Sequence, residues 1–126
     1  MADLRTILIA EDSSVILNLT KKILELQNYH IVAAKNGSEV MKTIEKQKID
    51  GILMDLNIPG KDGMACTREI RSNPDPQIAN IPIIAVTGNA NNYSMDDFKQ
   101  AGINAYLQKP VDFDMLVQTV KQYISQ

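Results

Sequence analysis

Acidic residues stand directly after two apolar runs of the sequence, at points where buried strands are expected to end. Asp55 follows the run Gly51–Met54, and Glu11 and Asp12 follow the run Ile7–Ala10. If these strands are neighbours in a parallel sheet, three carboxylates converge, and like charges about 4 Å apart repel by roughly 1 kcal/mol even in water. Such a cluster calls for a hard cation such as Mg²⁺, which prefers oxygen ligands. The pattern therefore predicts a metal-dependent phosphate site.

Two further strand ends carry polar side chains that suit the same chemistry. Thr87 follows the run Ile83–Val86, and Lys109 follows the run that starts at Ala105. Phosphoryl transfer depends mainly on positioning and charge neutralisation, so a cation, a lysine and a hydroxyl donor can share the oxygens of the transferred group. A carboxylate can then attack the phosphorus in line, and in this set Asp55 would be the nucleophile.

Each of these residues also has a purely structural interpretation. Asp12 is a favoured helix N-cap, and Asp55 and Asn57 could shape the turn that follows the strand. Thr87 could cap a strand end, and Lys109 could be a solvated surface charge. A shared functional site is favoured because all of these residues fall at the carboxyl ends of predicted strands. The structural interpretation would need several independent coincidences to explain this.

The elements that must position these residues alternate along the chain as strand and helix. The expected strands are 6–10, 30–34, 51–54, 83–86 and 105–107, and the expected helices begin near Ser13 and Gly37 and cover 64–71, 93–101 and 113–124. Because each crossover between parallel strands runs over the sheet, this order predicts an α/β fold with a doubly wound five-stranded parallel sheet in the order 2-1-3-4-5. Ligands bind such sheets beyond the carboxyl ends of strands one and three. Residues 72–80 are expected to form a long loop.

Composition narrows the function further. The 126 residues, 44% of them hydrophobic, fit one domain, and a formal net charge of −2 argues against direct nucleic-acid binding. The single cysteine, Cys66, suits a reducing cytoplasm and is expected to be a small half-buried helix residue. No run approaches the roughly 18 apolar residues of a membrane helix, and no signal peptide is recognisable. We expect residues 1–126 to form one cytoplasmic domain that binds neither nucleic acid nor membrane.

Five motifs together resemble the receiver domains of two-component response regulators over nearly the whole length of the chain. They are Ile9-Ala10-Glu11-Asp12, residues 54–63 (Met-Asp-Leu-Asn-Ile-Pro-Gly-Lys-Asp-Gly), residues 81–87 (Ile-Pro-Ile-Ile-Ala-Val-Thr), Ala101-Gly102 and Tyr106-Leu107-Gln108-Lys109-Pro110. The resemblance implies a flavodoxin-like (βα)5 receiver fold and a phosphoprotein of the chemotaxis-regulator type. Such a protein is a signalling switch that catalyses its own phosphorylation and dephosphorylation, and is not an enzyme in the usual sense.

The resemblance also implies roles for individual residues. Asp55 would accept a phosphoryl group from a histidine kinase or histidine phosphotransfer protein, and Lys109 would contact the phosphoryl oxygens. Mg²⁺, with Mn²⁺ as an alternative, would be held by Glu11, Asp12, Asp55 and the main-chain carbonyl of Asn57. The acidic pair is Glu-Asp where Asp-Asp is the commoner pattern in the family, but the longer Glu11 should still reach the metal or its waters.

The switch residues implied by the resemblance lie on the fourth and fifth strands. Thr87 would hydrogen-bond the phosphoryl group, and Tyr106 would move inward into the space that Thr87 vacates. The surface of the fourth helix, fifth strand and fifth helix would then control a downstream protein or output domain. The peptide bond before Pro110 would be cis. Asn57 and Asn89 resemble the positions that tune the rate of dephosphorylation.

Two other classes of protein stay open. A phosphatase of the haloacid-dehalogenase type also forms an aspartyl phosphate, but it needs a second Asp where Asn57 stands and a cap domain that 126 residues cannot supply. An adaptor that has lost phosphorylation would usually lack Asp55, Thr87 or Lys109, all of which are present. Residues 65–71 and 85–90 look more like receivers attached to hybrid histidine kinases than those of DNA-binding regulators.

Overall fold

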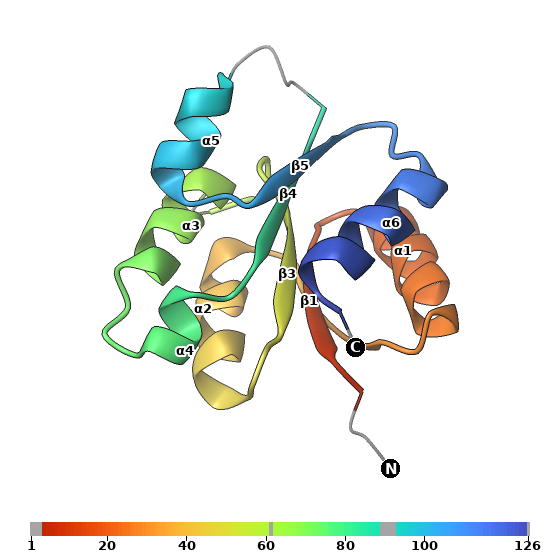
Figure 1. Ribbon diagram of the computed structural model, residues 1–126, viewed down its shortest axis with the longest axis horizontal. Helices are drawn as coiled ribbons and strands as arrows, with labels where there is room; N and C mark the ends of the chain where they lie inside the picture. Colours follow the sequence, from red (N-terminus) through yellow and green to blue (C-terminus); the bar gives the residue numbers. More distant parts are fainter. Residues whose placement is uncertain (1–3, 61, 89–92, 126) are drawn as a thin grey trace.

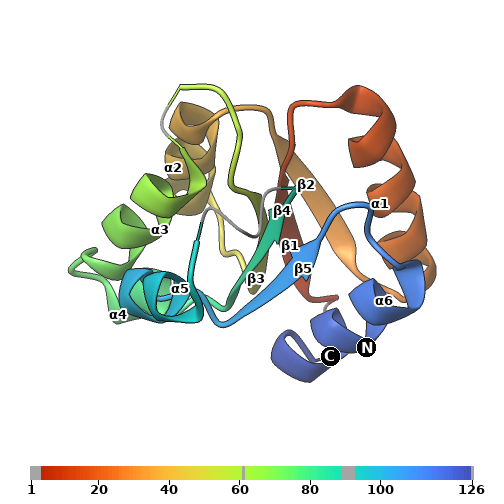
Figure 2. The same ribbon diagram turned by 90° about the horizontal axis from the view of Figure 1, so that it is seen from above.

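Five parallel strands form the middle layer of the structure. The computed structural model describes residues 4–60, 62–88 and 93–125. The strands are β1 (Thr6–Ala10), β2 (His30–Ala34), β3 (Gly51–Asp55), β4 (Ile83–Thr87) and β5 (Ala105–Gln108). Their order in the sheet is β2-β1-β3-β4-β5. Figure 2 shows the strands between the helices of the two outer layers. The predicted doubly wound order is confirmed, so β1 and β3 are neighbours and their carboxyl ends meet at one rim.

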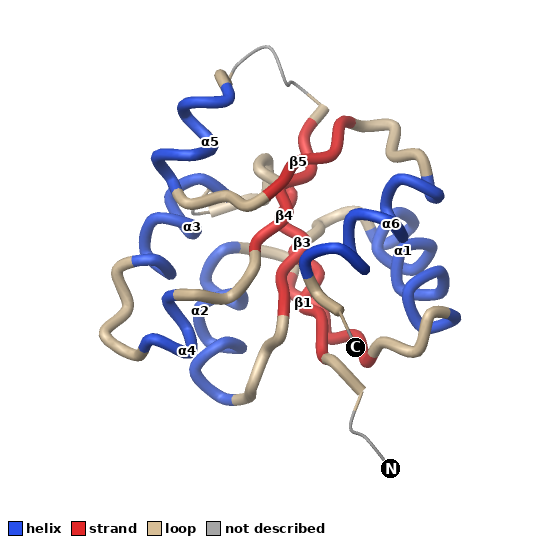
Figure 3. Tube along the Cα trace, viewed as in Figure 1, coloured by secondary structure: helices blue, strands red, loops and turns tan. Residues whose placement is uncertain are grey.

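Helices cover both faces of this sheet (Figures 1 and 3). Helices α1 (Ser14–Leu26) and α6 (Phe113–Tyr123) lie on one face. The other face carries α2 (Gly37–Lys46), α3 (Gly63–Arg71), the single turn α4 (Pro76–Ala79) and α5 (Met95–Ala101). Within the described ranges, no helix is long and apolar enough to cross a bilayer.

The core lies in two clusters, one on each side of the sheet. All five residues of β3 are buried, as expected for a central strand covered on both faces. Alternate residues of neighbouring strands serve opposite clusters, because successive side chains of a strand point to opposite faces. Ile52 and Ile83 pack under α2, α3 and α5, whereas Leu53 and Ile84 pack under α1 and α6. The sheet is thus fixed from both sides, which holds its carboxyl rim in place.

Several elements differ by a residue or two from the predicted boundaries. Strands β3, β4 and β5 each extend one residue further than predicted, to Asp55, Thr87 and Gln108. Asp55 and Thr87 are therefore the last residues of paired strands, and the ladder holds their backbones. The helix expected at 93–101 begins at Met95, because the Ser94 side chain caps it.

Two local expectations were wrong. The segment 72–80 is not all loop, since Asp75 caps the one-turn helix α4 by accepting a bond from the Gln77 amide, and a proline at the first position suits a helix start. Cys66 is fully buried rather than half-buried. Its Sγ lies 3.9 Å from the Gly37 carbonyl oxygen, because α3 packs against α2 at this point.

Candidate functional site

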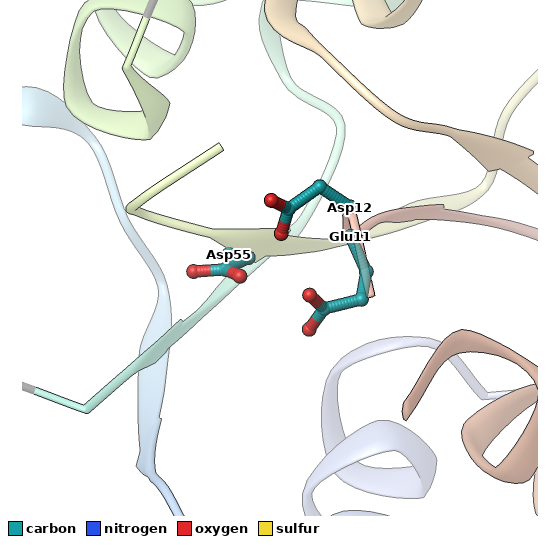
Figure 4. Close-up of side chains that lie close together, drawn as sticks. All are labelled: Glu11, Asp12 and Asp55. Carbon is teal, nitrogen blue, oxygen red and sulfur yellow. The ribbon is translucent and has the colours of Figure 1, made fainter. Parts of the chain in front are cut away.

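Three carboxyl groups meet at the carboxyl rim of β1 and β3 (Figure 4). Asp55 ends β3, while Glu11 and Asp12 directly follow β1. Each of the three residues offers a carboxylate oxygen that lies within 4.8 Å of those of the others. Glu11 and Asp55 are buried, at 4% and 3% exposure, whereas Asp12 is exposed. The cluster is therefore closed on the inside and opens to solvent at Asp12.

The ammonium group of Lys109 lies between the two buried carboxylates. Its Nζ is 3.0 Å from Oδ2 of Asp55 and 3.3 Å from Oε1 of Glu11. The backbone amide of Lys109 donates to the Thr87 carbonyl at 2.9 Å, which extends the β4–β5 ladder and places the lysine at the same rim. The peptide bond from Lys109 to Pro110 is cis. Lys109 is thus a paired residue and not a solvated surface charge.

Backbone amides hold the remaining oxygens of the two buried carboxylates. Oδ1 of Asp55 accepts a bond of 2.9 Å from the Asn57 amide, and Oε2 of Glu11 accepts one of 3.1 Å from the Ser13 amide. Asp55 therefore shapes the turn, as its structural interpretation required, and also faces the cluster. Asp12 is not the cap of α1, since that role falls to the Ser13 side chain. Both buried carboxylates are consequently fixed in orientation.

The charges of the cluster are unbalanced. Burial raises the pKa of the Glu11 carboxyl, and the nearby Asp55 charge adds to the rise, while the Ser13 amide and Lys109 oppose it. Burial lowers the pKa of Lys109, but contacts with Asp55 and Glu11 outweigh it and the net shift is upward. Lys109 therefore stays charged at neutral pH. When all groups are ionised, three carboxylates face one ammonium, which leaves two negative charges for a divalent cation.

Gly63, the first residue of α3, allows the helix to pack closely against the strand end that carries Asp55. A Cβ at position 63 would lie 2.7 Å from the Leu56 Cα and 3.0 Å from the Asp55 carbonyl oxygen. Such distances are too short for a side chain. The Asp62 side chain caps the same helix by accepting a bond from the Ala65 amide. The start of α3 thus supports the turn after Asp55.

The two predicted switch residues lie in different surroundings. Thr87 is fully buried at the end of β4, the strand beside Asp55. Tyr106 is on the edge strand β5, where it is 39% exposed and its ring centroid lies 5.2 Å from that of Phe98 in α5. The predicted position Asn89, and Lys61 in the motif of residues 54–63, fall outside the described residues.

A cavity of about 450 Å³, which the sequence did not reveal, adjoins the cluster on the α1 and α6 side. Glu11, Asp55 and Lys109 lie at its polar end. Its apolar wall includes Ile9, Ile16, Leu19, Leu53, Phe113 and Leu116. These residues were expected only to build the faces of strands and helices, and nothing in their spacing indicates that the two helices leave room between them.

Comparisons with known proteins agree on one family. The family model described as the response regulator receiver domain matches residues 7–121. The CAI-1 autoinducer sensor kinase/phosphatase CqsS of Vibrio cholerae is 38% identical over 120 residues, which are 95% of this chain and 17% of that protein. The polar-differentiation response regulator DivK of Brucella anthropi is 28% identical over 95% of this chain and 96% of its own length. The chain thus spans a small part of the first relative and nearly all of the second.

A solved structure shows the same architecture. The receiver domain of the sensor histidine kinase PA1611 of Pseudomonas aeruginosa superposes with a TM-score of 0.86 at 32% identity, and the match covers 98% of this chain and 99% of that one. That structure has a magnesium ion coordinated in its active site cleft.

Proposed function

The chain belongs to the response regulator receiver domain family of two-component signalling, and we propose that Asp55 is its phosphoacceptor. Receiver domains are signalling switches, not classical enzymes, and they interact with histidine kinases or phosphotransfer proteins and with output domains. The observation that carries the proposal is the setting of Asp55, a buried carboxylate with one oxygen on the Lys109 ammonium and the other on the Asn57 amide. A residue that only shaped the turn would not need the lysine.

Phosphorylation at Asp55 would proceed by in-line attack. A carboxylate oxygen forms a bond to the phosphorus of a phosphohistidine, the bond between phosphorus and the imidazole nitrogen breaks, and its electron pair leaves with the imidazole. The product is an acyl phosphate. Nζ of Lys109 lies 3.0 Å from Oδ2 of Asp55, so its ammonium group can contact the oxygens of the incoming phosphoryl group. The fixed orientation of Asp55 reduces the ordering that the transition state requires.

The same residues suit a divalent metal ion. Glu11, Asp12, Asp55 and the main-chain carbonyl of Asn57 would hold Mg²⁺, with Mn²⁺ as an alternative. The donors are all oxygen, their carboxylates lie within 4.8 Å of one another, and their charge exceeds that of Lys109. When bound, the metal neutralises negative charge on the carboxylates and on the transferred group. The magnesium ion in the PA1611 receiver supports this assignment.

A change at Thr87 and Tyr106 would carry the signal to the surface. The Thr87 side chain, buried beside Asp55, would bond to the phosphoryl group, and Tyr106 would leave its exposed position against Phe98 and turn inward. The surface of α5, β5 and α6 would then present a different face to a downstream protein or output domain. Helices α5 and α6 are the fourth and fifth helices expected from the sequence, because the short α4 was not expected. Such a shift, from mostly one state to mostly the other, takes about 5 kcal/mol of preferential binding.

The phosphodonor protein would dock on the face of the sheet that α1 and α6 cover, over α1 and the start of α6. Ile16, Leu19 and Phe113 are 41%, 46% and 42% exposed and also line the cavity beside Asp55. Exposed apolar residues that surround a reactive group indicate a protein-binding surface. A helix with an apolar face would fit there, and its phosphohistidine would then lie over the acidic cluster.

The remaining expectations concern extent and location. Residues 1–126 would act as a single receiver domain that works in the cytoplasm and whose partners are proteins, not nucleic acid or membrane. The family match over residues 7–121 supports the first point.

Incubation with acetyl phosphate tests the proposal. We expect one phosphoryl group per chain in the presence of Mg²⁺, none in excess EDTA, and complete removal of the group by hydroxylamine, which cleaves acyl phosphates. Labelling that persists in EDTA or that resists hydroxylamine would contradict the assignment. Continued release of phosphate over many turnovers of a phosphomonoester would instead favour a phosphatase.

A further inference from the structure

Arg71, the last residue of α3, ties together segments on one face of the sheet. Its Nε donates to the Gly102 carbonyl at 2.9 Å, and its Nη1 donates to the carbonyls of Ala79 and Ile81, each at 2.7 Å. Its Nη2 donates to Oδ1 of Asn104 at 2.9 Å. The guanidinium group thus binds the end of α4, the approach to β4 and the turn between α5 and β5.

Asn104 extends this contact to the start of β4. Its Oδ1 also accepts a bond of 2.8 Å from the Ile83 backbone amide, and the backbone amide of Asn104 donates to the Ile83 carbonyl at 2.9 Å. The residue immediately before β5 is therefore held by α3 and by β4 at once. Hydrogen bonds from a charged donor are stronger than those between neutral groups, so this is a firm attachment.

Gly102 is the residue that lets Arg71 approach. It ends α5 in the left-handed conformation, with φ of 97°, and its amide donates to the carbonyls of Phe98 and Lys99. A Cβ at this position would lie 2.7 Å from both Cγ and Nε of Arg71. Both the backbone conformation and the close approach of the arginine thus call for glycine here, and the C-terminal end of α5 is pinned.

The N-terminal end of α5 is held differently. The Ser94 side chain accepts from the Asp97 amide, and the Asp97 side chain accepts from the Ser94 amide, so these capping bonds lie within the helix itself. Met95 is 63% exposed. Phe98 is the first buried residue of the helix, and its ring contacts Tyr106, the residue expected to move.

We propose that Arg71 is a positioning residue that fixes the C-terminal end of α5 and the start of β5, so that α5 pivots about Gly102 when the state of Asp55 changes. The N-terminal half of α5 and Tyr106 move, while residues 102–104 stay on the Arg71 side chain. The pivot rests on the proposed function, because it describes how phosphorylation at Asp55 reaches the surface. The attachment itself does not depend on phosphorylation.

Amide hydrogen exchange of the full, unphosphorylated chain tests the attachment. The variant Arg71→Lys keeps the charge but loses the forked donors, and Arg68→Lys is the control, since Arg68 is an exposed residue of the same helix. We expect the amides of Gly102 and Ile103 to exchange at least tenfold faster in Arg71→Lys, with those of residues 96–98 unchanged. Equal acceleration along the whole helix, or none, would overturn the role of Arg71.

Amide NMR spectra with Mg²⁺ and beryllofluoride, a mimic of the phosphoryl group, test the pivot. In the wild type we expect shift changes at residues 94–98 and 106 and little change at 102–104, whereas in Arg71→Lys the changes should extend through 102–104. If residues 102–104 of the wild type move as much as 94–98, the pivot is wrong. If the amides of Asp55, Leu56 and Thr87 do not respond at all, the proposed function fails instead, and hydrogen exchange alone decides whether Arg71 holds this turn.

Discussion

Nζ of Lys109 lies 3.0 Å from Oδ2 of Asp55, although 54 residues separate them in the chain. The contact exists because β3, β4 and β5 are consecutive in the sheet and end at one rim. The same ammonium is 3.3 Å from Glu11, so one lysine serves both buried carboxylates. A metal ion at this rim therefore shares its ligands with Lys109.

Replacing Lys109 with Met should increase Mg²⁺ affinity and slow phosphorylation. Loss of the ammonium removes a repulsion of about 1 kcal/mol or more, which corresponds to an approximately fivefold gain in affinity. The rate with acetyl phosphate should fall, because no cation of the protein then follows the phosphoryl oxygens. Isothermal titration calorimetry and a phosphorylation time course measure the two effects. Lys99→Met, at an exposed position of α5, is the control. Weaker Mg²⁺ binding in Lys109→Met would contradict the shared site.

Stability without metal should depend on pH through Glu11. Burial raises the pKa of Glu11 in the folded protein above its usual value of 4.5. At a pH between the usual pKa and the raised pKa, the folded state therefore binds more protons than the unfolded chain. Stability is therefore lost as pH rises through this window. The variant Glu11→Gln has no group at this position that titrates. The free energy of unfolding of Glu11→Gln should therefore rise relative to that of the wild type as pH increases from 4.5.

Urea unfolding in EDTA at a series of pH values measures this difference. Glu25→Gln, at an exposed position of α1, is the control for the loss of one carboxylate. A difference between Glu11→Gln and the wild type that stays constant with pH would show that burial of Glu11 does not shift its proton affinity.

Leu19→Asp should separate the two kinds of phosphodonor. A charge among the exposed apolar residues of α1 should slow transfer from a phosphorylated histidine kinase or phosphotransfer protein by about tenfold or more, as loss of an interface anchor does. The rate with acetyl phosphate should not change, because a small donor does not need the exposed apolar surface of α1. Leu26→Asp, at the far end of the same helix, is the control, and that leucine is 80% exposed. Equal slowing with both donors would argue for damage to the fold instead of a lost docking surface.

Tyr106→Trp should report the switch by fluorescence, because the chain has no tryptophan of its own. The side chain starts 39% exposed, so burial on addition of Mg²⁺ and beryllofluoride should shift its emission to shorter wavelength. Adding Thr87→Ala should abolish the shift without abolishing Mg²⁺ binding. Tyr123→Trp in α6 should show no shift. A shift that persists in the Thr87→Ala background would show that the movement at position 106 does not depend on Thr87.

Much of the fold and of the rim could be predicted because both follow from local patterns. An apolar run followed by an acid marks the end of a buried strand, and the alternation of strands and helices leaves few topologies, so Glu11 and Asp55 could be placed together in advance. Residue type alone did not decide which residue caps helix α1. Asp12 and Ser13 are both good N-caps, and only the geometry of the α1 entry shows that Ser13 takes the role.

Other features depend on packing between distant segments. Arg71 has the sequence environment of an ordinary basic residue at a helix end, and its acceptors come from the 79–81 and 102–104 segments. The cavity beside Asp55 arises from the spacing between α1 and α6, which no single segment encodes. The burial of Cys66 likewise depends on how α3 meets α2.

Intact-mass spectrometry after incubation with Mg²⁺ and acetyl phosphate tests most directly whether Asp55 is the phosphoacceptor. We expect one added phosphoryl group on the wild type and on the control Asp96→Asn, an exposed position of α5, and none on Asp55→Asn. Equal labelling of Asp55→Asn and the wild type would contradict the assignment of Asp55.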